Sequence, residues 1–244
     1  MQKKETLNSL LKKIFTHYAF GEIKILLSIL FMIAGLLMFL LLAGAVLAGG
    51  TNRLDEFLLL SLRQPGSYTR PRGPYALIGI MRDITSLGGA TVIVLFSVIT
   101  IIYLLLQKKR RSAMLVLLAT LGGGLLENLL KLLIARQRPA LAFQLMPEYS
   151  HSFPSGHSMM SAVIYLSIAV LIARIQKNRN VRIYVVITGI FMTFIIGISR
   201  VYLGVHYPTD VLAGWALGLA WASFVWFVSW YMEYKGKSDE TSEQ

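Results

Sequence analysis

Six apolar runs, each long enough to cross a lipid bilayer, constrain the fold of this chain more than any other feature. They lie near residues 25–50, 88–106, 113–134, 157–173, 183–199 and 211–232. A helix of about 20 apolar residues spans the hydrocarbon core of a membrane. Charged residues make up only 15% of the chain, which is less than soluble domains carry. We therefore predict an all-α, polytopic membrane protein, a six-transmembrane helix bundle with interfacial helices.

The polar ends of the sequence divide it into three segments. Residues 1–24 carry leucines at helical spacing and lysines elsewhere, which predicts a cytoplasmic amphipathic helix on the inner leaflet; packing on the cytoplasmic loops is the alternative. Residues 25–232 form the six-helix membrane domain, and residues 233–244 form a polar cytoplasmic tail. The first apolar run is too long for the core of a cleaved signal peptide, so we expect a retained helix.

The distribution of basic residues predicts the orientation. With the N-terminus inside, the cytoplasmic segments hold 15 of the 24 Lys and Arg residues. Short loops rich in Lys and Arg stay in the cytoplasm. We therefore expect a multi-pass protein of a bacterial-type plasma (inner) membrane with both termini cytoplasmic. The net charge of +12 then reflects mostly topology, and we expect neither a nucleic-acid partner nor an obligatory protein partner.

The outer loop at 51–87 is the longest. Apolar residues at helical spacing within 54–62 and 77–84, separated by a Pro/Gly-rich stretch, predict two interfacial helices. These helices either border a lipid entrance or cap the bundle. Gly122–Gly124 and the pair Gly214 and Gly218 lie inside membrane helices, where small residues allow close helix packing.

The residue types present limit which kinds of metal or redox site the chain could form. Cysteine is absent, which excludes disulfides and thiolate metal sites. The four histidines form no His-x3-His pair and have no acidic cluster beside them. We therefore predict no catalytic metal and no cofactor.

Three polar clusters stand at the outer ends of membrane helices, where charged groups are costly unless they are paired, hydrated or functional. The first holds Lys131, Arg138 and Pro139. Seven residues are close to two helical turns, so the two cations could face one direction. Pro139 would then stop the helix. The alternative is that both cations extend to lipid headgroups.

The second cluster is Pro154-Ser155-Gly156-His157, directly before an apolar run. Free N–H groups at a helix N-terminus attract anions, Gly156 lets the backbone approach closely, and Ser155 adds a hydroxyl donor. An ordinary helix cap is the alternative. His157 is harder to explain structurally, since histidine titrates near neutrality.

The third cluster runs from Ser199-Arg200 through His206 to Asp210. A carboxylate four residues after a histidine indicates an imidazole oriented for catalysis. Pro208 lies between them, so we assume no regular helix there. The alternative is a structural ion pair between Arg200 and Asp210. Cations, histidines and a Gly turn together indicate a phosphate site.

In this order, the patterns K-x6-R-P, P-S-G-H and S-R-x5-H-x3-D resemble the signature of the type-2 phosphatidic acid phosphatase family. Every signature position is matched, over residues 131–210. The resemblance implies that His206 attacks phosphorus, that Asp210 orients His206, and that His157 protonates the leaving oxygen. It further implies phosphate binding by five of the other matched residues, Lys131, Arg138, Ser155, Gly156 and Arg200.

The family's integral-membrane branch implies a metal-independent lipid phosphatase acting at the outer membrane face through a phosphohistidine. The substrate would be a membrane lipid phosphate or diphosphate, such as undecaprenyl diphosphate, phosphatidylglycerol phosphate, phosphatidate or a lipid A phosphate. The sequence does not choose among these. A lipid phosphotransferase using the same site and a transporter remain alternatives. Oligomeric state and the roles of His151, Arg70 and Arg72 stay open.

Overall fold

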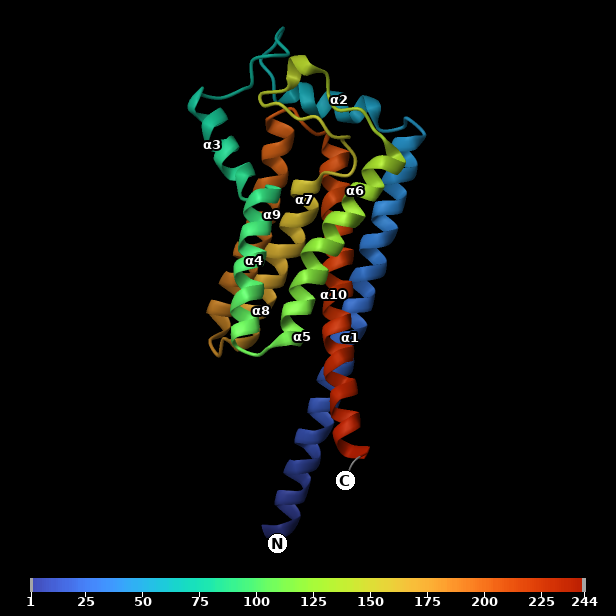
Figure 1. Cartoon of the computed structure of the whole chain (residues 1–244), viewed down its shortest axis with the longest axis vertical. Helices are drawn as coiled ribbons and strands as arrows, with labels where there is room; N and C mark the ends of the chain where they lie inside the picture. Colours follow the sequence, from blue (N-terminus) through green and yellow to red (C-terminus); the bar gives the residue numbers. More distant parts are fainter. Residues whose placement is uncertain (1, 243–244) are drawn as a thin grey trace.

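The structure, a computed structural model, describes residues 2–242 and is helical in all its regular elements (Figure 1). Side chains are described for residues 23, 25–140, 142–173, 176–232 and 234. The elements are α1 (Gln2–Leu47), α2 (Asn52–Ser61), α3 (Ala76–Ser86), α4 (Ala90–Leu106), α5 (Arg110–Leu117), η1 (Leu118–Gly122), α6 (Gly123–Ile134), η2 (Leu141–Phe143), α7 (Gly156–Ser161), η3 (Ala162–Leu166), α8 (Ser167–Ile175), α9 (Arg179–Tyr202) and α10 (Pro208–Ser242).

The six-helix membrane bundle predicted from the sequence is confirmed. Within the described residues, the stretches long and apolar enough to cross a membrane are Ile25–Leu47, Ala76–Leu106, Arg110–Ile134, Gly156–Ala173, Arg179–Tyr202 and Pro208–Met232. π-Helical turns, η1 and η3, interrupt the third and fourth spans without ending them. α1 begins and α10 ends at the same end of the bundle (Figure 1).

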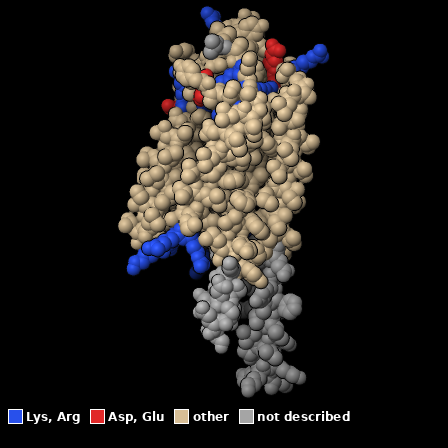
Figure 2. Space-filling view, turned by 45° about the vertical axis from the view of Figure 1, so that its right-hand side comes forward, with Lys and Arg blue, Asp and Glu red and all other residues tan. Residues whose placement is uncertain are grey.

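The outer surface of the bundle is apolar over its middle. Figure 2 shows a broad uncharged band, with Lys and Arg at one end and charges of both signs at the other. Leucines of the membrane helices such as Leu41, Leu132 and Leu133 are about 70% exposed. A soluble monomer rarely exposes so large an apolar surface, whereas lipid tails cover it without cost. The chain is therefore a multi-span membrane protein.

The segment at 51–87, which the sequence predicted to be an outer loop, contains the two helices predicted there, α2 and α3. α2 lies across the end of the bundle, as expected for an interfacial helix (Figure 1). α3 instead slants toward α4, and the two belong to one candidate span, Ala76–Leu106. α3 ends at Ser86 and α4 begins at Ala90, so a helix boundary lies where the second span was predicted to begin, at 88. The interfacial position of α3 therefore stays a prediction.

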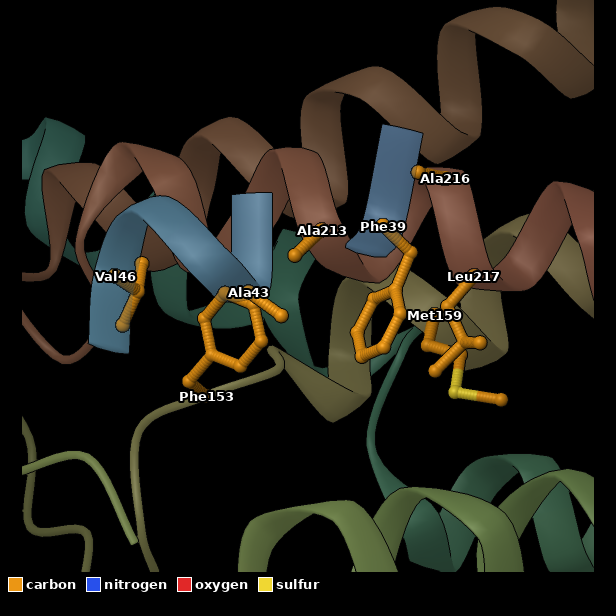
Figure 3. Packing of buried hydrophobic residues seen from close by; sticks show 8 residues of the cluster. All are labelled: Phe39, Ala43, Val46, Phe153, Met159, Ala213, Ala216 and Leu217. Carbon is orange, nitrogen blue, oxygen red and sulfur yellow. The ribbon is translucent and has the colours of Figure 1, made fainter. Parts of the chain in front are cut away.

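The core lies where α1, α7 and α10 meet. Phe39, Ala43 and Val46 of α1 pack against Ala213, Ala216 and Leu217 of α10, with Met159 of α7 and Phe153 of the preceding loop (Figure 3). Phe153 is fully buried and its ring centroid lies 5.8 Å from that of Phe39. This contact ties the loop before α7 to the membrane core.

Glycines bring α10 unusually close to α7. A Cβ at Gly214 would lie 2.5 Å from the carbonyl oxygen of Ser155, and one at Gly218 would lie 2.5 Å from that of Met159. Any larger residue would push the helices apart. The predicted packing role of this glycine pair is therefore confirmed, and it places the start of α7 directly beside the start of α10.

The two ends of the chain are helical. α1 includes both the segment 1–24 and the first span, and α10 continues to Ser242. The amphipathic face predicted for residues 1–24, and the polar side chains of most of the tail at 233–244, lie outside the described side chains. Both segment assignments therefore stay predictions.

Candidate active site

The three polar clusters meet at one end of the bundle, where α6 ends, where α7 and α10 begin, and where α9 turns into α10. His206 occupies the turn between α9 and α10. Its Nε2 lies 3.1 Å from Nη1 of Arg138, and its Nδ1 lies 3.5 Å from Oδ2 of Asp210. The sequence therefore placed these three residues together correctly.

His206 is buried, with 1% of its surface exposed. Burial lowers the pKa of its imidazole well below the ordinary value of 6.5. The cations Arg200, Arg138 and Lys131 lower the same pKa further. The ring is therefore neutral at neutral pH, which is the form in which a histidine nitrogen can act as a nucleophile.

Asp210 is fully buried in the first turn of α10, and hydrogen bonds hold both of its oxygens. Its Oδ2 accepts bonds from the Ser152 hydroxyl at 2.5 Å and the Tyr207 N–H at 2.8 Å, and its Oδ1 pairs with Arg136 at 2.5 Å. The backbone N–H of Ser155 donates to the Asp210 carbonyl. The carboxylate is thus fixed with Oδ2 turned toward the His206 ring.

Lys131 and Arg138 do not share a helix face, in contrast to the prediction. α6 ends at Ile134, and Ala135 adopts the left-handed conformation, with φ of 48°. Arg138 therefore lies in the loop. Its guanidinium donates to the carbonyl oxygens of Ser150 and Val205, both at 2.6 Å.

The loop nevertheless returns Arg138 to the same place as Lys131. Nζ of Lys131 lies 3.3 Å from the Ser150 hydroxyl, and Nη2 of Arg138 lies 3.0 Å from it. Lys131 also pairs with Glu127 at 2.8 Å, the partner expected one helical turn before it. Both cations point into the protein rather than to lipid headgroups, so the headgroup alternative is not supported.

Arg200 is fully buried near the end of α9 and pairs with Glu148, a residue of the loop before α7. Its Nη1 lies 3.2 Å from the Thr85 hydroxyl. Its Nε is a buried polar atom without a hydrogen-bond partner among the described residues. The alternative of an Arg200–Asp210 ion pair is wrong, since each of the two has another partner. An orphaned guanidinium N–H beside a cation cluster suits an incoming anion.

Ser155 and Gly156 lie at the start of α7, as predicted. Ser155 is the residue before the helix, but its side chain makes no capping hydrogen bond; its Oγ accepts from Ser158 at 3.0 Å. A Cβ at position 156 would collide with the Glu127 carboxylate. A larger residue at this position would therefore displace the Glu127 side chain, which pairs with Lys131.

His157 follows in the first turn of α7 and packs beside the turn that joins α3 to α4. A Cβ at Gly89 would lie 3.7 Å from its Nε2. Its ring is within electrostatic range of Arg200, His206, Lys131 and Arg138. His157 therefore borders the same cation cluster as His206.

Four residues of this site were not predicted from the sequence: Asp55, Arg136, Glu148 and Ser152. Arg136 and Ser152 hold Asp210, Asp55 holds Arg136, and Glu148 faces Arg200 and lies 3.6 Å from Arg138. A signal was available for Asp55, an acid within the apolar repeat of α2, and for Arg136, a further cation inside the K-x6-R-P segment. Nothing in the spacing pointed to Glu148.

The residues whose roles were left open bring no side chain into the bonds of the cluster, although the His151 carbonyl accepts a bond from Nη2 of Arg138 at 3.4 Å. The side chains of His151 and Arg70 are exposed. Nε of Arg72 donates to the Arg63 carbonyl at 2.9 Å within the outer segment. Among the residues the structure describes, no three His, Asp or Glu side chains are grouped so as to hold a metal ion.

Comparison with known proteins agrees with this site. The sequence profile of the PAP2 superfamily matches residues 112–234, which include every residue of the three clusters. Phosphatidylglycerophosphatase B of Bacillus subtilis is 36% identical over 75% of this chain and 87% of that protein. Lipid A 1-phosphatase of Rhizobium johnstonii is 37% identical over 42% of this chain and 41% of that protein.

A solved structure has the same fold. The transmembrane PAP2-type phosphatidylglycerolphosphate phosphatase of Bacillus subtilis superposes with a TM-score of 0.68 at 33% identity. The match covers 86% of this chain and 96% of that one.

Proposed function

Because the chain belongs to the PAP2 superfamily and is a membrane-embedded phosphoric ester hydrolase, we propose that it removes phosphate from a membrane lipid through a phosphohistidine on His206. The observation that carries this proposal is the setting of the His206 ring. Nδ1 faces Asp210 and Nε2 faces Arg138, so the carboxylate lies on one side of the ring and the phosphate-binding cations on the other.

In the first step, the lone pair on Nε2 of neutral His206 attacks phosphorus and forms a P–N bond. The P–O bond to the lipid breaks, and His157, in the imidazolium form that the negative charge of the bound phosphate favours, gives a proton to the leaving oxygen. In the second step, His157 takes a proton from water, whose oxygen attacks phosphorus and breaks the P–N bond. Inorganic phosphate leaves, and both histidines return to their starting states.

The cations supply the remaining catalysis. Phosphoryl transfer depends mostly on positioning and on stabilising charge on the nonbridging oxygens. Lys131, Arg138 and Arg200 surround the proposed phosphate position, where the Glu148 carboxylate now contacts both arginines. A phosphate would take over those contacts and the unpaired Nε of Arg200. The Ser155 hydroxyl and the Gly156 N–H would complete its binding.

A lipid phosphate is the substrate class that suits this position. The site lies at the end of apolar helices, so a lipid tail can stay in the bilayer while its headgroup reaches the cations. Phosphatidylglycerol phosphate is the first candidate, because a relative that is 36% identical over 75% of this chain is named a phosphatidylglycerophosphatase. The other candidate substrates are phosphatidate, undecaprenyl diphosphate and a lipid A phosphate.

The sidedness of the site is part of the proposal. The end of the bundle opposite the site carries basic residues (Figure 2), which favours a cytoplasmic location for that end. The site and the segment at 51–87 would then face the extracytoplasmic side of a bacterial-type plasma membrane.

The test is phosphate release from these four lipids by the purified protein in detergent, with EDTA present and His206→Ala as the control. We expect inorganic phosphate from at least one lipid and none from the variant. Phosphate found on a second lipid instead of free in solution would show a phosphotransferase. No turnover of any lipid phosphate would contradict the proposal.

A further inference from the structure

Arg136 lies between two buried carboxylates, one of which belongs to the proposed catalytic apparatus. Its Nη1 is 2.5 Å from Oδ1 of Asp210, and its Nη2 is 2.7 Å from Oδ2 of Asp55. Both carboxylates are fully buried. Its guanidinium also stacks on the Tyr207 ring, 4.4 Å from the centroid.

The charge of Arg136 and those of the two carboxylates stabilise each other. Two carboxylates and one guanidinium leave a net charge of −1 in a buried place, where an unpaired carboxylate would be strongly disfavoured. The planar guanidinium can bind one carboxylate through each nitrogen, which lysine cannot do in the same geometry. Removing Arg136 would leave two like charges facing each other.

Asp55 connects this group to α2 and to the start of α10. Its Oδ1 accepts the backbone N–H of Thr209 at 3.0 Å, and its Oδ2 accepts the Thr209 hydroxyl at 2.6 Å. A carboxylate at a helix N-terminus binds free N–H groups and complements the helix dipole. α2, the loop after α6, and the first turn of α10 are therefore joined by one chain of bonds that ends at Asp210.

We propose that Arg136 and Asp55 are positioning residues for the Asp210–His206 pair. Arg136 fixes the Asp210 carboxylate with Oδ2 toward the imidazole and shares its negative charge, and Asp55 fixes Arg136. Neither residue touches the phosphate. This inference rests on the proposed function, since it assigns Asp210 the task of orienting His206.

Removing Arg136 would change the pH at which His206 takes up a proton. The charged and titratable groups that face its ring are Lys131 of α6, Arg138 of the loop, His157 of α7, Arg200 of α9 and Asp210 of α10. In the Arg136→Gln variant, the hydrogen bonds from Ser152 and the Tyr207 N–H still keep Asp210 ionised. Its negative charge, however, is no longer balanced by the guanidinium. Asp210 would then favour the imidazolium form more strongly, and His206 would protonate at higher pH.

The experiment measures kcat, KM and the pH profile of kcat/KM for four variants in detergent. They are Arg136→Gln, Arg136→Lys, Asp55→Asn and the double variant Asp55→Asn/Arg136→Gln. We expect a loss of about 10–100-fold in kcat for each single variant, typical of residues that orient a functional group, with KM unchanged. The acid limb should move to higher pH in Arg136→Gln and stay in place in Arg136→Lys, which keeps the charge.

The double variant tests whether the two residues act as one unit. If they do, it loses no more kcat than the worse single variant, because coupled residues are not additive. The double variant also removes one charge of each sign, so it keeps folding testable if Arg136→Gln is unstable. Additive losses, or a rise in KM with unchanged kcat, would overturn the proposal.

Arg63→Gln is the matched control. Arg63 is a buried arginine of the outer segment, but it donates to the backbone carbonyls of Tyr68, Tyr202 and Phe143 and not to Asp210. The Arg63→Gln variant should have a lower melting temperature, while the acid limb of its kcat/KM profile stays in place. An acid limb that moves equally in Arg63→Gln and Arg136→Gln would mean general destabilisation and would overturn the proposal.

The two proposals fail in different ways. If wild type releases no phosphate, or His206→Ala keeps its activity, the proposed function is wrong. If wild type is active through His206 but Arg136→Gln keeps the wild-type kcat and acid limb, only the positioning role is wrong.

Discussion

Arg200 forms its buried ion pair with Glu148, which lies in the loop before α7. The carboxylate of Glu148 also lies 3.6 Å from Nη2 of Arg138. It thus stands between two of the three cations proposed to bind the phosphate, in the position of an anion. An internal carboxylate held by the same guanidinium groups supports an anion-binding role for Arg200 over a purely structural one.

Replacing Arg200 tests this role. Lysine keeps the charge but loses the planar group that offers several N–H donors. We expect Arg200→Lys to fold but to lose about 10²–10³-fold in kcat, the usual cost of removing one such electrostatic donor. Measurements of kcat and melting temperature for Arg200→Lys and Arg200→Ala check it.

Arg82→Lys is the control, since Arg82 also binds a backbone carbonyl of the 135–155 loop, that of Leu145, but is exposed. It should keep nearly full turnover. A near-wild-type kcat for Arg200→Lys would remove Arg200 from the phosphate site.

Activity should survive chelation. The proposed mechanism stabilises the transferring phosphoryl group with Lys131, Arg138 and Arg200 and asks nothing of a metal ion. We expect phosphate release to be unchanged by EDTA and inhibited by vanadate, which mimics the phosphoryl group. Loss of activity in EDTA, with recovery on adding one divalent ion, would refute this mechanism.

The orientation in the membrane can be tested by cysteine labelling, since the chain has no cysteine. Thr69 and Gln107 are exposed at opposite ends of the bundle. We expect an impermeant maleimide to label Thr69→Cys in intact cells and to label Gln107→Cys only after the membrane is opened. The reverse pattern would place the site on the cytoplasmic side.

The lowered pKa of His206 predicts how stability depends on pH. The unfolded chain takes up a proton at its ordinary histidine pKa of about 6.5, but in the folded protein the His206 pKa lies well below this. Between these two values the unfolded state binds more protons, so this contribution to stability is lost as the pH falls below about 6.5.

His206→Gln should therefore make the melting temperature fall less steeply below that pH. Thermal unfolding in detergent at several pH values measures it, with the exposed His151→Gln as the control. An unchanged slope in His206→Gln would mean that the imidazole is not held neutral by the fold.

The spans and the grouping of the candidate site residues could be predicted from the sequence because each depends on local information. A transmembrane helix needs only a long apolar run, and all six were found. The grouping of Lys131, Arg138, His157, Arg200, His206 and Asp210 followed from helix ends that share one side of a membrane. The break at Gly88 and Gly89 was also local information, and α4 begins at Ala90, close to the predicted start of the second span.

The partners of the charged residues could not be read in the same way. Asp210 pairs with Arg136, and Arg200 pairs with Glu148, because the loop at 135–155 folds back over the ends of α9 and α10. That path depends on the left-handed Ala135, on Phe153 in the core and on the backbone bond from Ser152 to Arg136. Spacing along the sequence contains none of this. Arg200 and Asp210 seemed natural partners only because they are close in sequence.

The most direct test of the account is to trap the phosphoenzyme. Wild type, His206→Ala and His157→Ala are each mixed with a lipid or an aryl phosphate that is radiolabelled in its phosphate. The reactions are quenched and the protein is tested for acid-labile label. We expect label on wild type, none on His206→Ala, and some on His157→Ala with an aryl phosphate, whose leaving group needs no proton. Label that persists on His206→Ala would show that another residue is the nucleophile.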